Sequence, residues 1–218
     1  MKTISLVCTV HAEKGLANVV ELRAILERLR PEVIFLEVPP DAFDCYYGAC
    51  TRENLESKAV QQHRENNQVE LVPIDLSPPG EDFFRDNQYL FERIEEKSYE
   101  YRRLVDRNSI YVRDYGFAYL NSEYCCKHWS DLDAEILTTI RTIDEPRLAE
   151  LYELWKQTIE LRDEEMLKNV RQYCGDNSFE KGVFLVGSAH RQAIIDKSKA
   201  RPGDEQTTMQ WDFLGNDS

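Results

Sequence analysis

The fold is decided by the stretch Ile4-Ser5-Leu6-Val7-Cys8-Thr9-Val10 and by its counterpart Val33-Ile34-Phe35-Leu36-Glu37-Val38. Both are short apolar runs with flanking breakers, which is the pattern of buried strands. Between them, Asn18 is placed to cap a helix that continues at helical spacing to about Arg30, where Pro31 stops it. A strand, a helix and a strand in this order predict a βαβ unit with parallel strands.

Three further strands are expected along the chain. Two more apolar runs, Val69–Ile74 and Val183–Val186, have the length and composition of buried strands. A weaker fifth segment, Thr208–Phe213, alternates apolar and polar residues, which suits an edge strand. A second helical crossover, around Asn54–Asn66, leads from the second strand to the third.

The segment from about 80 to 175 has helical patterning almost throughout, with breaks expected only at Asn108–Ser109 and at Asp144–Pro146. It stands between the third and fourth strands. We therefore expect an α/β fold with a mainly parallel central sheet, flanking helices and a large helical insertion between strands three and four. Residues 1–218 are expected to form a single α/β domain that includes this insertion.

Composition excludes several classes of partner. The formal net charge of −13 argues against general affinity for the phosphate backbone of nucleic acids. No apolar run approaches the roughly 20 residues that a membrane helix needs. The six cysteines contain no C-x2-C pair of a zinc site, so reduced thiols in a cytoplasmic protein are expected. Cys45 and Cys50 would bridge only in an exported protein.

Polar residues follow the predicted strands, where ligands bind in open parallel sheets. His11 follows the first strand, Glu37 closes the second and Asp75 follows the third, while His190 comes shortly after the fourth. A carboxylate within Phe35-Leu36-Glu37-Val38 loses hydration on folding, which raises its pKa unless a cation or donors compensate. Together these groups supply what metal-assisted or general-base hydrolysis requires. A single His or Asp at a strand end is more typical of a helix cap or a satisfied polar group, whereas Glu37 would be costly to bury without a partner.

At these positions the sequence resembles the TraB/Tiki superfamily, which also takes in erythromycin esterases and ChaN-like proteins. Cys8-Thr9-Val10-His11 and Gly187-Ser188-Ala189-His190 resemble its paired G-x-x-H motifs, and Glu37 matches the Glu that closes the second strand. The stretch Arg162-Asp163-Glu164-Glu165-Met166-Leu167-Lys168-Asn169 resembles its helix motif R-D-x-x-M-x-x-N.

The resemblance implies a site containing His11, Glu37, Arg162 and His190, in a superfamily whose activities include metal-dependent peptidases, macrolide-ester hydrolysis and haem binding. Cys8 departs from the pattern, because the first motif usually has Gly there; we interpret Cys8 as a buried small hydrophobe rather than a nucleophile. Arg162 either pairs on the surface with its acidic neighbours or faces Glu37, where it would orient the carboxylate or bind a substrate oxyanion.

Three functions follow as hypotheses. The first is a hydrolase of an ester or amide bond in a small molecule or peptide, in which His11, Glu37 and His190 hold a divalent metal or act without one. The second is a protein that binds haem or another small ligand with the same histidines. The third is a catalytically degenerate scaffold. The sequence lacks the H-E-x-x-H and G-x-S-x-G motifs, which disfavours those two hydrolytic mechanisms.

Overall fold

A five-stranded parallel sheet forms the centre of the computed structural model, which describes residues 1–48, 52–77, 79–200 and 209–215. The strands are β1 (Lys2–Thr9), β2 (Val33–Leu36), β3 (Glu70–Pro73), β4 (Lys181–Gly187) and β5 (Met209–Phe213). Every pairing between neighbouring strands is parallel. The predicted α/β class is confirmed, and the fifth strand lies at an edge as expected. Thr208, which was included in that strand, lies outside the described residues.

The strand order β3-β2-β4-β1-β5 brings three functional strand ends together. β1 and β2 are parallel, as the βαβ prediction requires, but β4 lies between them and pairs with both. From β1 the chain crosses past the position of β4 to β2 and then to β3, which lie on one side of β4. It then returns to β4 and ends at β5, which lies beside β1 on the other side. Such a reversal of direction is where open parallel sheets place their ligands.

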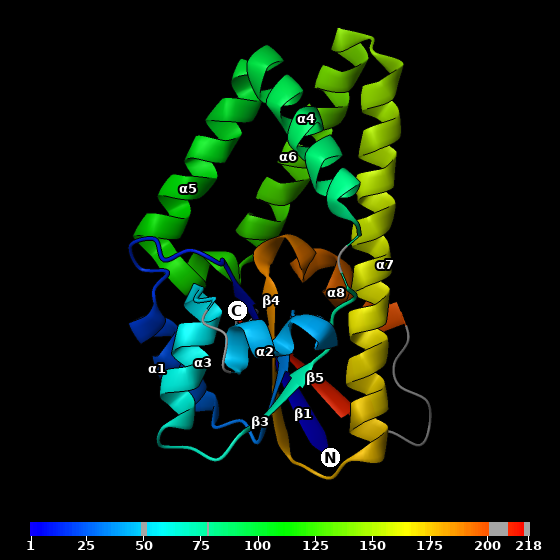
Figure 1. Cartoon of the computed structure of the whole chain (residues 1–218). Helices are drawn as coiled ribbons and strands as arrows, with labels where there is room; N and C mark the ends of the chain where they lie inside the picture. The colour runs from blue at the N-terminus through cyan, green and yellow to red at the C-terminus, as the bar shows by residue number, and fades with distance from the viewer. Residues whose placement is uncertain (49–51, 78, 201–208, 216–218) are drawn as a thin grey trace.

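Helices cover both faces of this sheet (Figure 1). α1 (Val19–Leu29) and α3 (Leu55–Arg64) pack together on one side, whereas α7 (Pro146–Asp176) and α8 (Arg191–Ala200) pack together on the other. Asn18 caps α1 as predicted, since its side chain accepts the Glu21 N–H. The short η1 (Pro40–Ala42) and α2 (Phe43–Tyr47) follow β2, and η2 (Ser188–His190) joins β4 to α8.

The helical insertion consists of α4 (Glu81–Lys97), α5 (Tyr99–Leu120), α6 (Glu123–Ile143) and the first part of α7. The predicted break at Asp144–Pro146 is confirmed, because Asp144 adopts a left-handed conformation and Pro146 starts α7. The predicted break at Asn108–Ser109 is wrong. Asn108 lies inside α5, where its side chain accepts a hydrogen bond from the Tyr119 hydroxyl.

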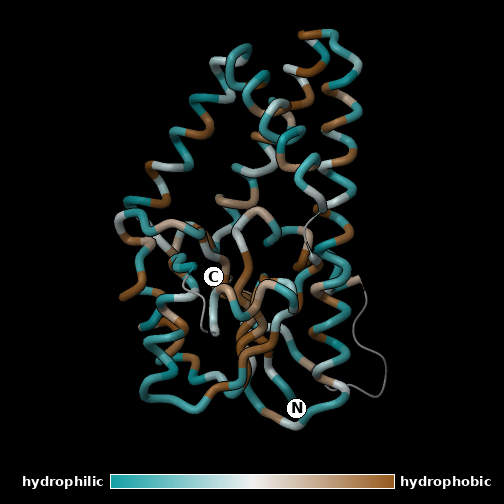
Figure 2. Tube along the Cα trace, viewed as in Figure 1, coloured by the Kyte–Doolittle hydropathy of each residue, from teal (hydrophilic) through white to brown (hydrophobic). Residues whose placement is uncertain are grey.

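The insertion has an apolar core of its own. The main core surrounds the sheet, and a second cluster consists of Leu90, Ile94, Ile136, Ile140, Leu148, Leu151 and Tyr152. Figure 2 shows hydrophobic residues concentrated in the sheet and alternating with polar ones along the insertion helices. No helix in the described part of the chain is long and apolar enough to cross a membrane.

Gly116 joins the insertion to the sheet layer by allowing α5 to bend. Its φ of 51° lies in the left-handed region, and a Cβ there would be 2.5 Å from the Leu16 carbonyl oxygen. The C-terminal end of α5 is then tied to β1 by Asn121. Its side-chain oxygen accepts the Cys8 N–H at 2.8 Å, and its side-chain nitrogen donates to the Cys8 carbonyl at 3.1 Å. The insertion is thereby fixed close to the strand end that carries His11.

Candidate functional site

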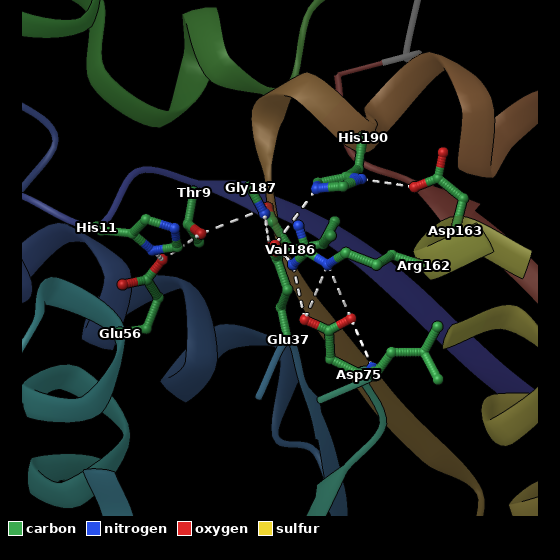
Figure 3. A network of polar contacts seen from close by, with 11 residues as sticks. Thr9, His11, Glu37, Glu56, Asp75, Arg162, Asp163, Val186, Gly187 and His190 are labelled. Carbon is green, nitrogen blue, oxygen red and sulfur yellow. Dashed lines mark hydrogen bonds and ion pairs between the residues drawn. The ribbon is translucent and has the colours of Figure 1, made fainter. Parts of the chain in front are cut away.

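Glu37 is the centre of a buried polar network at the carboxyl end of β2 (Figure 3). Its Oε1 accepts a hydrogen bond from Arg162 Nη2 at 2.7 Å and lies 3.3 Å from His190 Nε2. Its Oε2 accepts the Gly187 N–H at 2.6 Å. Burial raises the pKa of Glu37, but the His190 contact, the charge of Arg162 and the Gly187 N–H lower it to about 2. The hydrogen-bond donors that the sequence analysis required to offset the burial of Glu37 are therefore present, and Glu37 is an anion.

Arg162 reaches from α7 to two carboxylates. Besides Glu37, it binds Asp75 through Nε to Oδ1 at 3.1 Å and through Nη2 to Oδ2 at 2.6 Å. The Asp75 side chain is only 4% exposed, so this is a buried, two-point ion pair. Asn169, two turns further along α7, donates to the Ile74 carbonyl at 2.9 Å and fixes the same helix against the end of β3. Arg162 therefore faces Glu37 and does not pair with its acidic neighbours on the helix surface, which was the alternative.

His190 is held between two carboxylates. Its Nδ1 lies 2.5 Å from Asp163 Oδ1, and its Nε2 faces Glu37. Burial lowers the pKa of His190, but the contacts with Asp163 and Glu37 raise it to about 10, so the ring is an imidazolium. From the sequence, Asp163 was the Asp of the R-D-x-x-M-x-x-N motif and an acidic neighbour of Arg162, and it was given no role in the site. Its spacing of three, four and seven residues from the apolar Met166, Leu167 and Val170 was the signal that it faces inward.

His11 lies beside this network and not within it. Its Nδ1 is 3.1 Å from Glu56 Oε1, which also accepts a hydrogen bond from the Thr9 hydroxyl at 2.7 Å. The hydrogen bond to Glu56 raises the pKa of His11, while partial burial lowers it. The side chain is 68% exposed, and its Nε2 has no hydrogen-bond partner among the described residues. Glu56, in the first turn of α3, was missed because nothing local in the sequence shows which strand end that turn faces.

Two adjoining cavities open at these strand ends. The smaller, of about 20 Å³, is lined by His11, Glu37, Glu56 and Tyr47 among others, and it has room for about one water molecule. Glu56 Oε2 is buried here and has no partner among the described residues. The larger cavity, of about 700 Å³, is lined by His11, Glu37, Asp75 and Arg162 together with residues of the insertion. That volume is typical of a small-molecule site.

Of the four site residues predicted from the sequence, three are in direct contact through Glu37, and the fourth, His11, lies beside them. Glu37, Arg162 and His190 form one set of direct contacts, and His11 and Glu37 line the same two cavities. His190 contacts Glu37 but does not line either cavity.

Cys8, the departure from the first G-x-x-H motif, takes no part in the cavities. It is fully buried, with its Sγ 3.9 Å from Arg191 Nη1, and it lines neither cavity. Burial raises the pKa of its thiol to about 12, so the side chain stays protonated. This agrees with the interpretation of Cys8 as a small core residue. Cys50, considered for a bridge to Cys45, lies outside the described residues.

The donor set does not fit a metal in this arrangement. Both ring nitrogens of His190 face carboxylates, and both oxygens of Glu37 already accept hydrogen bonds. Within residues 1–48, 52–77, 79–200 and 209–215, no three His, Cys, Asp or Glu side chains are grouped so as to hold an ion. Of the two histidines, His11 is the one with a ring nitrogen open to a ligand, including haem iron.

Searches with protein-family models, among curated proteins and among solved structures gave no match to this chain.

Proposed function

We propose that the chain is a hydrolase of ester or amide bonds in small molecules or peptides, with His11 as the general base. The observation that carries this proposal is the orientation of His11. Glu56 engages Nδ1 and leaves Nε2 free at a cavity that also contains Arg162 and Glu37. A carboxylate that fixes one ring nitrogen favours the tautomer in which the other accepts a proton.

The remaining residues have supporting parts in this proposal. Arg162 lines the larger cavity, and its Nη1 has no hydrogen-bond partner among the described residues, so it is available to an oxyanion that develops on the substrate carbonyl. Glu37 and Asp75 hold the guanidinium in place. His190 is a positioning residue, since it acts on Glu37 and is itself oriented by Asp163.

The resemblance to the TraB/Tiki superfamily supports hydrolysis as the function of the four motif residues, His11, Glu37, Arg162 and His190. The proposal also includes a cytoplasmic location. The variant of the proposal in which His11, Glu37 and His190 share a divalent metal remains a prediction. We derive no step through an ion, because the side chains as arranged satisfy one another.

His11→Asn tests the proposal, because Asn keeps a donor near the position of Nδ1 and removes Nε2. Hydrolysis of a panel of methyl esters and peptide amides is expected to fall by about 10²-fold or more in this variant, with an unchanged thermal melt. Glu53→Gln, an exposed cavity residue outside the proposed machinery, serves as the control and is expected to keep wild-type rates. Wild-type rates in His11→Asn would refute the role of His11. Elemental analysis of the purified protein tests the metal version separately.

A further inference from the structure

The larger cavity has two chemically different walls. His11, Asn54 and Glu53 lie on one wall, from the end of β1 and the start of α3. The other wall is apolar and includes Leu76, Phe83, Phe84 and Ile159, from the segment after β3, the first turn of α4, and α7. The polar wall carries the proposed base His11, and the apolar wall, which is supplied mainly by the insertion, adjoins Arg162.

The apolar wall begins directly beside Arg162. Ile159 precedes Arg162 by three residues on α7, so the two side chains lie on the same face of that helix. Leu76 likewise follows Asp75, the ion-pair partner of Arg162. An apolar group attached close to the reacting carbonyl would therefore meet this wall as soon as the carbonyl reaches Arg162.

Phe84 is the most unusual member of this wall. Its side chain is 55% exposed, although it lines the cavity, and its ring packs edge-on against Phe83 with ring centroids 5.8 Å apart. Leu76, on the same wall, is 37% exposed. Apolar surface left exposed inside a site of this volume is surface that a ligand can remove from water.

The wall offers nothing to a charged group. Of the charged residues that line the cavity, Asp75 and Arg162 adjoin this wall in sequence and are paired with each other, whereas Arg52 and Glu53 precede α3. An ionised acyl group placed here would lose hydration without gaining a partner. An aromatic group would bury its own surface and that of Phe84, and aromatic rings add favourable edge contacts with one another.

Resting on the proposed hydrolase function, we infer that the substrates carry an uncharged aromatic or branched aliphatic acyl group, and that Phe84 is a specificity-determining residue that binds it. The reacting carbonyl lies at Arg162 and His11, and the acyl group extends along Ile159 and Phe83 towards Phe84.

Three methyl esters test this inference, because their leaving group is small and identical: methyl acetate, methyl phenylacetate and methyl (4-carboxyphenyl)acetate. The wild-type protein is expected to hydrolyse methyl phenylacetate with a kcat/KM about tenfold or more above that of each of the others. In Phe84→Ala the preference for phenylacetate over acetate is expected to fall about tenfold, mainly through KM. Tyr99→Ala removes an exposed aromatic outside the cavity and is expected to keep the wild-type preference.

A binding measurement separates this inference from the hydrolase proposal. The ketone isostere of methyl phenylacetate, with a methylene in place of the ester oxygen, is titrated calorimetrically into the wild type, Phe84→Ala and Phe84→Leu. Ketone binding that weakens about tenfold in Phe84→Ala and less in Phe84→Leu supports the role of Phe84, even if no ester is hydrolysed. Absence of ester hydrolysis would contradict the proposed hydrolase function but not the acyl-binding role of Phe84. Equal preference for the three esters, or equal ketone affinity in Phe84→Ala and wild type, overturns the inference.

Discussion

Glu37 shows how a buried carboxylate is kept as an anion. Its side chain is 9% exposed, yet both oxygens are occupied by donors from β4, from α7 and from the turn that carries His190. Each donor comes from a different segment, so the carboxylate links three parts of the fold. Removing the charge takes away the anion that faces the Arg162 guanidinium and the His190 imidazolium, and it leaves one oxygen acceptor where there were two.

Glu37→Gln is therefore expected to lower the free energy of unfolding by about 3 kcal/mol and also to weaken activity. The amide of Gln brings an NH2 group to a position where an oxygen now meets a donor. The measurement is urea unfolding at neutral pH, with Glu100→Gln as the control, since Glu100 forms an exposed ion pair with Arg103. A variant as stable as the wild type would mean that the network tolerates a neutral centre, and that Glu37 is retained for chemistry rather than structure.

Among the residues of the site, Glu37 was easier to predict from the sequence than Asp163 and Glu56, the carboxylates that contact the two histidines. Glu37 stands out because a carboxylate interrupts an apolar strand, and that anomaly is visible locally. Glu56 does not stand out, and Asp163 does so only through the motif resemblance, because each sits among other polar helix residues. Their partners lie 27 and 45 residues away, at His190 and His11, and only the packing of the chain brings them together.

Among the elements, α3 runs from the site along the face of the sheet that it shares with α1. Its first turn carries Glu56, which contacts His11, and its last turn carries His63, which is 1% exposed and packs near Arg23 and Glu27 of α1. His63 Nδ1 lies 3.4 Å from the Asn67 side-chain nitrogen, and no described residue bonds to Nε2. Burial lowers the pKa of His63, an effect that nearby Glu27 opposes.

His63 is consequently expected to make stability depend on pH. Because its pKa is lower in the folded state than in the unfolded state, the contribution is complete above the unfolded value of about 6.5 and is lost as pH falls towards the folded value. Between about pH 7.5 and about pH 5, the unfolding free energy should fall by more, or rise by less, in the wild type than in His63→Gln, because His11 and His190 have raised pKa values and act in the opposite direction. Parallel curves for the two proteins would show that His63 does not titrate differently on folding.

The elements themselves were largely predictable, and the exceptions have local causes. Strand and helix positions follow from apolar runs and caps, as at Asn18 and Asp144. The break expected at Asn108 failed because the Asn108 side chain is occupied by Tyr119, eleven residues along the same helix. Ser98 starts α5 instead, and its hydroxyl accepts the Tyr101 N–H.

In the whole molecule, the sheet and the insertion have separate apolar cores, and α7 belongs to both. Its first turns contribute Leu148 and Leu151 to the insertion core, and its later turns contribute Met166 and Val170 to the sheet core. The sequence predicts the insertion but not the place of β4 between β1 and β2. Both pairings of β4 are long-range, since more than 140 residues separate Val33 from its β4 partner Gly182.

Leu90→Ala tests whether the two cores unfold independently. Leu90 is fully buried in the insertion core, so its truncation is expected to cost about 2–4 kcal/mol. If the insertion opens as a unit, hydrogen exchange will accelerate in α4, in α6 and in the first turns of α7, while β1 and β4 keep their protection. The control is Leu161→Ala, at a position of α7 that is 59% exposed, and it should change neither the free energy of unfolding nor the hydrogen-exchange rates. Equal acceleration in the sheet would show one cooperative unit. Independent opening would let the apolar wall of the cavity move while the Glu37 network stays intact, because α4 supplies Phe83 and Phe84 but none of the contacts to Glu37.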